Sequence, residues 1–457
     1  MFENLELFLK KEFNFLPNKN QLRDIKRLIF EIMKRDKLTI EEILNYLKNI
    51  PQINKYCGRN KFFPIKDALI SKRFPLTNQK EKIDTKKIFL SDLKKPLKNN
   101  YRPLNEFIPK KIFVEKEVKD SYLVENFKKK FPNIEIEFLD YYSDYLKKHK
   151  FSLIDLKKPF VFIVKERWDF IKLCPCTKHH LSCGYWIFNL GFGCPFDCSY
   201  CFLQHYSNFP GIILPTNLED FFEKFDYFYK KLQAPIRIGT GEFLDSLALD
   251  EITQYSKKLI PYFKDKKLLF ELKTKSNKIS NLLEIEPSKN IIISWSLNPQ
   301  IIIEKEEIAT ANLFERLKAA KKIQQKGYSI GLHFDPIVHF ENWDFFYKQL
   351  IEKVYEILKP PFSWISLGTL RANRKLKTYV ELRFPESEIF YGELFIGEDK
   401  KLRYPLFLRI EIYKNMIKWI REFDQKTPIY FCMENKEVWK LLNKSSSKEI
   451  EKELLGL

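Results

Sequence analysis

The chain has 457 residues, 44% of them hydrophobic, which supplies a sizeable core and excludes a largely disordered protein. Glycine, at 13 residues, is too rare for a fibrous protein or an array of linkers. The formal net charge of +20 favours polyanionic partners such as nucleic acid, although a genome biased toward lysine codons explains it equally well.

Residues 1–110 are predicted to form a helical and irregular N-terminal extension. Apolar residues recur at helical spacing up to about residue 55, and Thr39 with Glu42 resembles a capping box. Helices of this kind either bind DNA or simply pack together. Residues 56–110 are rich in Lys, Pro and Asn and are expected to be irregular. The sequence shows no signal peptide and no membrane span, so we expect a cytoplasmic protein without membrane partners.

Residues 111–184 are predicted to form an α/β segment that leads into a larger domain. The run KKIFVEKEV is typical of a strand, SYLVENFKKKF of a helix and FVFIV of a buried strand. The segment ends in a dense group of cysteine and histidine residues. Residues 376–457 are expected to form a small C-terminal α/β region.

Between residues 185 and 375, short apolar strands alternate with helices such as 313–328 and 343–358. This alternation indicates a parallel sheet with helical crossovers. The fold class is therefore α/β, a partial (β/α)6 barrel of the TIM type, whose active site is expected at the carboxyl ends of the strands. The six predicted strands cover residues 185–192, 235–242, 267–275, 290–298, 328–337 and 362–370.

Six of the eight cysteines lie between residues 174 and 201, directly around the first predicted barrel strand. Cys194, Cys198 and Cys201 have the spacing C-x3-C-x2-C, which places three thiolates on one short loop. A 4Fe–4S cluster ordinarily takes four cysteines, so three would leave one iron open to a substrate or cofactor. A structural zinc site is the alternative, but it usually joins two separated ligand pairs.

This motif after the first barrel strand resembles the radical S-adenosylmethionine superfamily. There the open iron chelates S-adenosylmethionine, and reductive cleavage yields a 5′-deoxyadenosyl radical. The resemblance implies that Gly239, Thr240, Gly241 and Glu242, at the end of the second strand, bind this cofactor. Glycines at a strand end also commonly serve a turn.

The segments CSYCFLQ, FELKTK, SWSLN and GLHFDPIVHFENW are together similar to the spore photoproduct lyase family of DNA repair enzymes, over about residues 170–440. The resemblance implies a carbon–carbon lyase that cleaves a pyrimidine photoproduct in DNA and takes electrons from a donor such as flavodoxin or ferredoxin. It further implies catalytic roles for Tyr200, Lys273 and Ser296, with Ser296 and Asn298 also near the cofactor.

Two departures concern the return of a hydrogen atom to the product. Family members that repair the spore lesion have a cysteine near the end of the second strand, which IRIGTGEFLDS lacks, and a tyrosine where this chain has Phe202. Cys432 is one substitute; its alternative role is core packing. Cys174, Cys176 and Cys183 bind a second metal or cluster, supply the hydrogen, or are structural.

Further residues are candidates for the pocket or for phosphate contacts. His333, Asp335 and His339 lie on the fifth strand and its following loop and are pocket-lining candidates. Arg371 and Arg374 follow the last strand as phosphate contacts or as part of an exposed basic turn. Two other functions remain open. One is a radical enzyme of the same fold acting on a different nucleic acid or other substrate. The other is a metal-binding nucleic-acid protein without catalysis.

Overall fold

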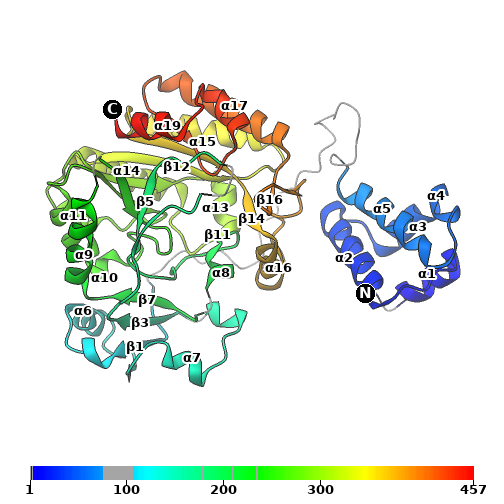
Figure 1. Cartoon of the computed structure of the whole chain (residues 1–457), viewed down its shortest axis with the longest axis horizontal. Helices are drawn as coiled ribbons and strands as arrows, with labels where there is room; N and C mark the ends of the chain where they lie inside the picture. The colour runs from blue at the N-terminus through cyan, green and yellow to red at the C-terminus, as the bar shows by residue number, and fades with distance from the viewer. Residues whose placement is uncertain are drawn as a thin grey trace.

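The computed structural model describes residue 2 and residues 4–75, 107–157, 159–176, 180–207, 209–232 and 235–456. Figure 1 shows a helical N-terminal unit beside a larger α/β body. Most of the predicted irregular stretch, residues 76–106, lies outside the described residues. None of the described helices is both long enough and apolar enough to cross a bilayer.

The N-terminal helices have a hydrophobic core of their own, which includes Leu9, Ile29 and Leu69. The predicted capping box of Thr39 and Glu42 is confirmed at the start of the third helix. The expectation of irregular structure beyond residue 56 is wrong for residues 62–73, where apolar residues at helical spacing pack into this core. The helices are α1 (Leu5–Phe13), α2 (Lys19–Asp36), α3 (Ile40–Lys48), α4 (Pro51–Asn54), η1 (Gly58–Lys61) and α5 (Phe62–Arg73).

A four-stranded parallel sheet precedes the barrel and has the order β2-β1-β3-β7. The strands predicted at 111 and 160 and the helix between them are confirmed, whereas β2 and β7 are additions to the sequence-based prediction. Every residue of β3 is buried, as its continuous apolar run indicates. The elements are β1 (Lys111–Glu115), η3 (Lys116–Val118), α6 (Tyr122–Lys130), β2 (Ile136–Leu139), α7 (Asp144–Lys148), η4 (Leu153–Lys157), β3 (Phe160–Val164) and β7 (Ile212–Pro215).

The main sheet is a curled half-barrel of eight strands in the order β17-β13-β12-β10-β9-β8-β5-β4. Its strands pair in parallel except for β4, which runs antiparallel to β5 at one edge. All six predicted barrel strands are confirmed, and β17 from the C-terminal region adds another parallel strand. The strands are β4 (Ile171–Leu173), β5 (Tyr185–Phe188), β8 (Arg237–Thr240), β9 (Leu269–Thr274), β10 (Ile291–Ser296), β12 (Ser329–Ile337), β13 (Trp364–Thr369) and β17 (Ile429–Phe431).

Helices pack on the outside of the half-barrel and bury its apolar surface in one large core (Figure 1). They are α8 (Leu203–Tyr206), α9 (Leu218–Lys230), α10 (Asp250–Thr253), α11 (Tyr255–Phe263), α12 (Ser280–Glu284), α13 (Gln300–Glu306), α14 (Leu313–Lys326), α15 (Trp343–Ile357), α16 (Arg374–Arg383), α17 (Leu406–Phe423), α18 (Lys436–Trp439), η5 (Lys440–Leu442) and α19 (Ser447–Leu455). Two small antiparallel sheets complete the body: β6 (Asp197–Cys198) with β11 (Glu307–Ile308), and β14 (Arg371–Asn373), β16 (Lys401–Arg403) and β15 (Phe395–Ile396).

The N-terminal unit contacts the α/β body through ion pairs between α2 and α16. Arg27 Nη2 lies 2.6 Å from Glu381 Oε1, and Lys377 Nζ lies 2.7 Å from Glu31 Oε1. Arg73 also reaches Glu31, at 2.9 Å, and is itself buried. The three cations Arg27, Arg73 and Lys377 thus surround the buried carboxylate of Glu31. The contact is therefore a buried ion network rather than a surface salt bridge.

Candidate active site

The three motif cysteines lie on the loop between β5 and α8, at the carboxyl end of the first barrel strand. The two-residue strand β6 pairs Cys198 with Glu307 of β11, which fixes the middle of the loop. The amide of Cys201 donates to the carbonyl of Cys198 at 3.1 Å. Desolvation raises the pKa of all three thiols.

Side chains from α8, which directly follows the loop, and from the distant helix α16 hold this loop in place. Gln204 Nε2 donates to the carbonyl oxygens of Cys198 and Ser199 at 3.2 and 2.7 Å. Arg383, at the end of α16, donates to Gln204 Oε1 at 2.5 Å and to Asp197 Oδ1 at 2.7 Å. The loop that carries the three motif cysteines, called the cluster loop below, is therefore anchored by α16 as well as by β11.

Glu307 is the centre of a buried hydrogen-bond network behind the loop. Its carboxylate accepts hydrogen bonds from the hydroxyl of Tyr200, from Asn298 Nδ2 at 2.9 Å and from Arg316 Nη2 at 2.6 Å. Burial alone would raise the pKa of Glu307, but the Arg316 guanidinium outweighs burial and lowers it to about 2. The acid is therefore ionised and holds Tyr200 in place.

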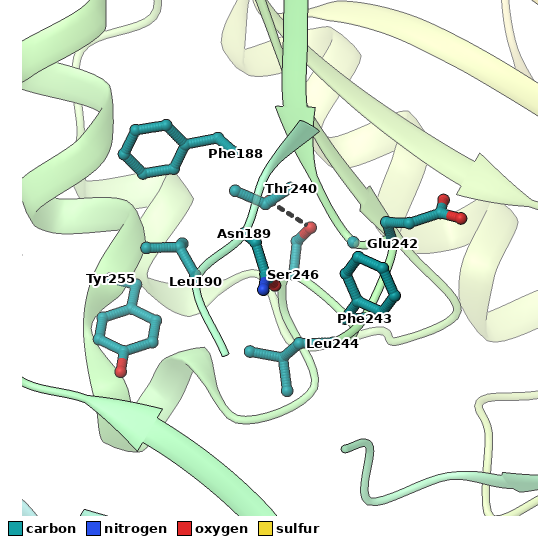
Figure 2. Close-up of a pocket in the computed structure, with 10 residues that line it drawn as sticks. Phe188, Asn189, Leu190, Thr240, Glu242, Phe243, Leu244, Ser246 and Tyr255 are labelled. Carbon is teal, nitrogen blue, oxygen red and sulfur yellow. Dashed lines mark hydrogen bonds between the residues drawn. The ribbon is translucent and has the colours of Figure 1, made fainter. Parts of the chain in front are cut away.

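The predicted cofactor-binding stretch lies at the end of β8 and just beyond it. Gly239 is within the strand, where a Cβ atom would meet the Tyr185 hydroxyl at 2.2 Å, so close packing explains this glycine. Thr240 Oγ1 lies 2.6 Å from Ser246 Oγ, a contact drawn in Figure 2. Gly241 has φ +92°, and a Cβ there would lie 2.8 Å from the carbonyl of Lys273.

Glu242 and Lys273 meet at the mouth of the half-barrel. Figure 2 shows the Glu242 side chain extending away from Tyr255 and Leu190, on the opposite side of the strand end. Its Oε2 lies 3.9 Å from Lys273 Nζ. Burial alone would lower the pKa of Lys273, but the carboxylates of Glu242 and Glu271 outweigh burial and raise it. Lys273 is therefore a charged ammonium group at the strand ends.

Ser296 and Asn298 follow at the end of β10, and both are buried. The carbonyl of Ser296 accepts a hydrogen bond from Arg316 Nη1 at 2.8 Å. The amide of Asn298 is hydrogen bonded at both ends, to Glu307 and to the hydroxyl of Tyr347 at 2.8 Å. The structure thus places Asn298 in the network that supports the cluster loop.

The pocket-lining and phosphate-contact candidates occupy different positions. His333 Nε2 lies 2.7 Å from Glu271 Oε1 inside the barrel. Arg371 is not part of an exposed turn, because its guanidinium forms a bidentate pair with Asp335, both contacts at 2.9 Å. Arg374, at the start of α16, is exposed as predicted. His339 is half-buried beside Trp343 and Tyr404, and desolvation lowers its pKa to about 4.

The upstream cysteines lie beside the amino end of β5, where the amide of Cys174 donates to the carbonyl of Tyr185, the first residue of that strand, at 2.8 Å. Cys174 hydrogen bonds to Cys176, which raises the pKa of the Cys174 thiol, and burial and the nearby Glu242 carboxylate raise it further. Cys183 is flanked by Cys176 and by the buried Arg237. No group of three His, Cys, Asp or Glu side chains among the described residues is arranged to hold a single metal ion. A second metal site at these cysteines remains a prediction.

Sequence reasoning misses the residues that fix the loop from behind: Glu307, Arg316 and Arg383. Each is far from the motif in the chain, so no local spacing connects them to it. The sequence carries one weak signal for Glu307: two adjacent acids, Glu306 and Glu307, stand at the end of an apolar helix. Both are buried, and a buried carboxylate requires hydrogen-bond or charged partners.

Comparisons with known proteins agree on one family. The family model for spore photoproduct lyase matches residues 107–404. The chain is 27% identical over 242 residues to the spore photoproduct lyase of Clostridium acetobutylicum, covering 51% of this chain and 70% of that protein. It is 25% identical over 302 residues to the Bacillus subtilis enzyme, covering 63% of this chain and 86% of that protein.

Solved structures agree on the fold. A spore photoproduct lyase complexed with dinucleoside spore photoproduct aligns with a TM-score of 0.62 and 22% identity, over 71% of this chain and 99% of that chain. A mutant of such a lyase with bound AdoMet and dinucleoside spore photoproduct aligns with a TM-score of 0.61 over the same shares. The region that the family model matches begins after the N-terminal helical unit.

A half-barrel with a C-x3-C-x2-C loop after its first strand defines a radical S-adenosylmethionine protein, which uses a 4Fe–4S cluster and S-adenosylmethionine. Because the family model covers well over half of its length, this chain belongs to the spore photoproduct lyase family.

Proposed function

We propose that this chain is a radical S-adenosylmethionine lyase that splits a methylene-bridged thymine photoproduct in DNA back into two thymines. One observation carries the proposal. The half-barrel brings the three-cysteine loop, Glu242 and Lys273 to the same ends of neighbouring strands, in a chain of the spore photoproduct lyase family. A similar lyase of known structure binds dinucleoside spore photoproduct, so this lesion is the first substrate to test.

Cys194, Cys198 and Cys201 are the residues that would hold the iron–sulfur cluster. Their chemistry fits it, since three thiols on one loop, Cys198 buried and the other two half-buried, lose their protons readily to a cationic metal centre. Each cysteine would ligate a different iron, so the thiols need not converge on one ion. When bound, the cluster and S-adenosylmethionine supply the reducing electron and the carbon radical that attacks the lesion.

Gly241 and Glu242 would hold the amino end of S-adenosylmethionine. The absent side chain at Gly241 leaves space above the Lys273 carbonyl, which a Cβ would fill at 2.8 Å. The Thr240–Ser246 hydrogen bond and the bond from the Lys273 amide to Ser246 Oγ, at 3.1 Å, fix the backbone there. The Glu242 carboxylate then accepts from an ammonium group, while Lys273 limits the net negative charge of the site.

The DNA partner and the electron donor are part of this proposal. A lesion within a duplex must be extruded into the barrel mouth, and basic side chains hold the phosphates on either side. The net charge of +20 suits this task, and the exposed Arg374 is the candidate contact near the mouth. A small acidic reductant such as flavodoxin or ferredoxin would supply the electrons.

The test is an anaerobic assay of reconstituted protein with dithionite, S-adenosylmethionine and a synthetic dinucleotide spore photoproduct. We expect repaired thymidylyl-thymidine by chromatography. Formation of 5′-deoxyadenosine without repair would overturn the lyase assignment and retain the radical chemistry. Neither product, with the cluster confirmed by its absorbance, would favour the binding protein without catalysis.

We expect Cys194→Ala, Cys198→Ala and Cys201→Ala each to lose the iron–sulfur absorbance and S-adenosylmethionine cleavage, because a lost thiolate leaves one more iron without a protein ligand. The matched control is Cys57→Ala, since Cys57 is an exposed thiol of the N-terminal unit. Iron per chain and 5′-deoxyadenosine are measured together. Cleavage that survives in any of the three variants would contradict the ligand assignment.

A further inference from the structure

A surface groove lies between the start of β4 and the helix α9. Residues 167–171 line this groove together with Lys224 and Phe228 of α9. The amide of Asn189 donates to the carbonyl of Phe170 at 2.8 Å. Because Asn189 directly follows β5, this hydrogen bond places the groove at the carboxyl end of that strand, where the cluster loop begins.

The backbone on one side of the groove is fixed by a single carboxylate. Glu166 Oε1 accepts hydrogen bonds from the amides of Arg167 and Trp168, at 2.8 and 2.9 Å. Asn217, the residue before α9, accepts from the amide of Glu166 at 2.9 Å and donates to its carbonyl at 3.0 Å. Trp168 is therefore held beside α9 in a preformed surface, which is the usual state of a rigid docking site.

A row of aromatic rings connects Trp168 to both ends of the cluster loop. The ring centroids of Trp168 and Phe192 lie 4.6 Å apart, and Phe192 stands two residues before the first motif cysteine. The Phe243 ring lies 5.1 Å from that of Phe192 and 6.2 Å from that of Phe202, which directly follows the third motif cysteine. These spacings are those of packed aromatic pairs, so side chains in contact join the groove to the cluster loop.

The charges around the groove favour an acidic partner. Lys224 on α9 and Lys172 on β4 are both exposed. Arg167 is paired with Glu117 at 2.5 Å, so the two lysines are the cations that a partner would meet first. Among the described residues that line the groove, Asp169 is the one acid. The net charge of +20 would in addition attract an acidic protein from a distance.

We propose that this groove is the docking site of the electron donor, a small acidic protein with a one-electron centre. The inference deepens the proposed function and rests on it. Electron tunnelling slows steeply with distance, so such a carrier has to bind close to the cluster loop. One electron passes from the carrier, which is oxidised, to the cluster that the motif cysteines would hold, which is reduced, and no bond or proton moves.

Oxidised flavodoxin, a small acidic carrier, is the probe for docking, and calorimetry measures its affinity for the reconstituted chain. We expect Lys224→Glu to weaken binding at least several-fold because it reverses a charge of the groove, and added salt to weaken binding to the unaltered chain. Lys230→Glu is the matched control, since Lys230 is an exposed lysine of the same helix outside the groove. Equal affinity of the two variants, or no binding to the unaltered chain, would overturn the docking site.

The rate of 5′-deoxyadenosine formation tests electron transfer through the same contact. It is measured with reduced flavodoxin and, separately, with dithionite, a small reductant that needs no protein docking site. Trp168→Ala should lower the flavodoxin-driven rate at least several-fold relative to the dithionite-driven rate. Trp168→Phe keeps a ring against Phe192 and should retain most of this ratio. An unchanged ratio in Trp168→Ala would overturn the role given to Trp168 and to the groove.

Neither experiment contains the photoproduct, so the failure of each proposal is visible separately. Absence of repair with dithionite would refute the proposed lyase while flavodoxin still bound at the groove. Repair with dithionite by a chain whose groove variants bind flavodoxin normally would refute the docking site alone.

Discussion

Glu306 and Glu307 are adjacent in the chain, yet the fold gives them opposite electrostatic environments. Both carboxylates are buried. Glu307 faces Arg316, and its pKa is lowered to about 2. Glu306 accepts from the hydroxyls of Ser199 and Ser387, the latter at 2.7 Å, and burial raises its pKa to about 7. One acid is therefore a permanent anion, and the other changes charge near neutral pH.

We expect Glu307→Gln to destabilise the chain by about 3–5 kcal/mol, since it leaves the buried Arg316 guanidinium without its counter-charge. Urea denaturation measures this loss, and iron per chain should fall with it because Tyr200 and β11 lose their anchor. Glu304→Gln, on the exposed face of α13, should change stability by less than about 0.5 kcal/mol. Equal stability of the two variants would contradict the role given to Glu307.

The effect of Glu306→Gln on the free energy of unfolding should depend on pH. The folded pKa of Glu306, about 7, lies above the ordinary value of 4.5, so ionisation penalises the folded state as pH rises through this window. The uncharged amide avoids that penalty. We therefore expect the variant to gain stability relative to the unaltered chain between pH 5 and pH 8, measured by urea denaturation. A constant difference across this range would contradict the raised pKa.

At this scale, local spacing determines what the sequence can predict. The ligand role proposed for Cys194, Cys198 and Cys201 is predictable because it depends on the spacing within one loop. Glu307 and Arg383 are not, because they reach the loop from more than a hundred residues away. Lys273 and Glu242 were predicted from the family resemblance, and in the structure Lys273 Nζ lies 3.9 Å from Glu242 Oε2.

At the scale of single elements, α16 contacts two parts of the molecule, the loop of the three motif cysteines and the N-terminal unit. Arg383 binds Asp197 and Gln204 of the cluster loop. Lys377 and Glu381 bind the N-terminal helices. The helix therefore fixes the loop on one side and receives the N-terminal unit on the other.

Arg383→Ala should loosen the cluster loop without unfolding the barrel, because it removes both side-chain bonds that α16 makes to the loop. We expect iron to be lost to a chelator at least several-fold faster than from the unaltered holoprotein, measured by absorbance. Arg374→Ala, an exposed arginine of the same helix, is the matched control. Equal rates of iron loss in the two variants would show that α16 does not hold the loop.

The barrel strands were predictable because each is a short apolar run followed by a helix. The strand β2 was missed because only Leu139 of its four residues is buried, so no apolar run marks it. The strand β7 was missed although all four of its residues are buried. The helix α5 was missed because its lysines and its proline suggested irregular structure, although Phe62, Ile65 and Leu69 share one buried face. For this helix, the spacing of the apolar residues indicates the secondary structure better than the amino-acid composition does.

At the scale of the whole molecule, the buried Glu31 joins the N-terminal unit to the body. Burial alone would raise its pKa, but Lys377, Arg73 and Arg27 lower it to about 2. Since the folded pKa lies below the ordinary 4.5, the stabilisation is complete above pH 4.5 and is lost as the pH falls toward 2.

The contact between the N-terminal unit and the body should therefore weaken between pH 4.5 and pH 3, before the barrel itself unfolds. Small-angle scattering should show a larger radius of gyration, and protease should cut between the two parts sooner. Glu31→Gln should show both changes already at pH 7 and little further change on acidification. An acid response that is the same in both proteins would exclude Glu31 as its source.

The ion network around Glu31 also has an evolutionary consequence. The family match begins at residue 107, whereas the partners of Lys377 and Glu381 lie in the first 75 residues. Relatives that lack the N-terminal unit need no charge pattern at these two positions of α16, because both would face water. Chains that possess the unit should instead show correlated substitution: where Glu31 is replaced, Lys377 and Arg73 should change with it.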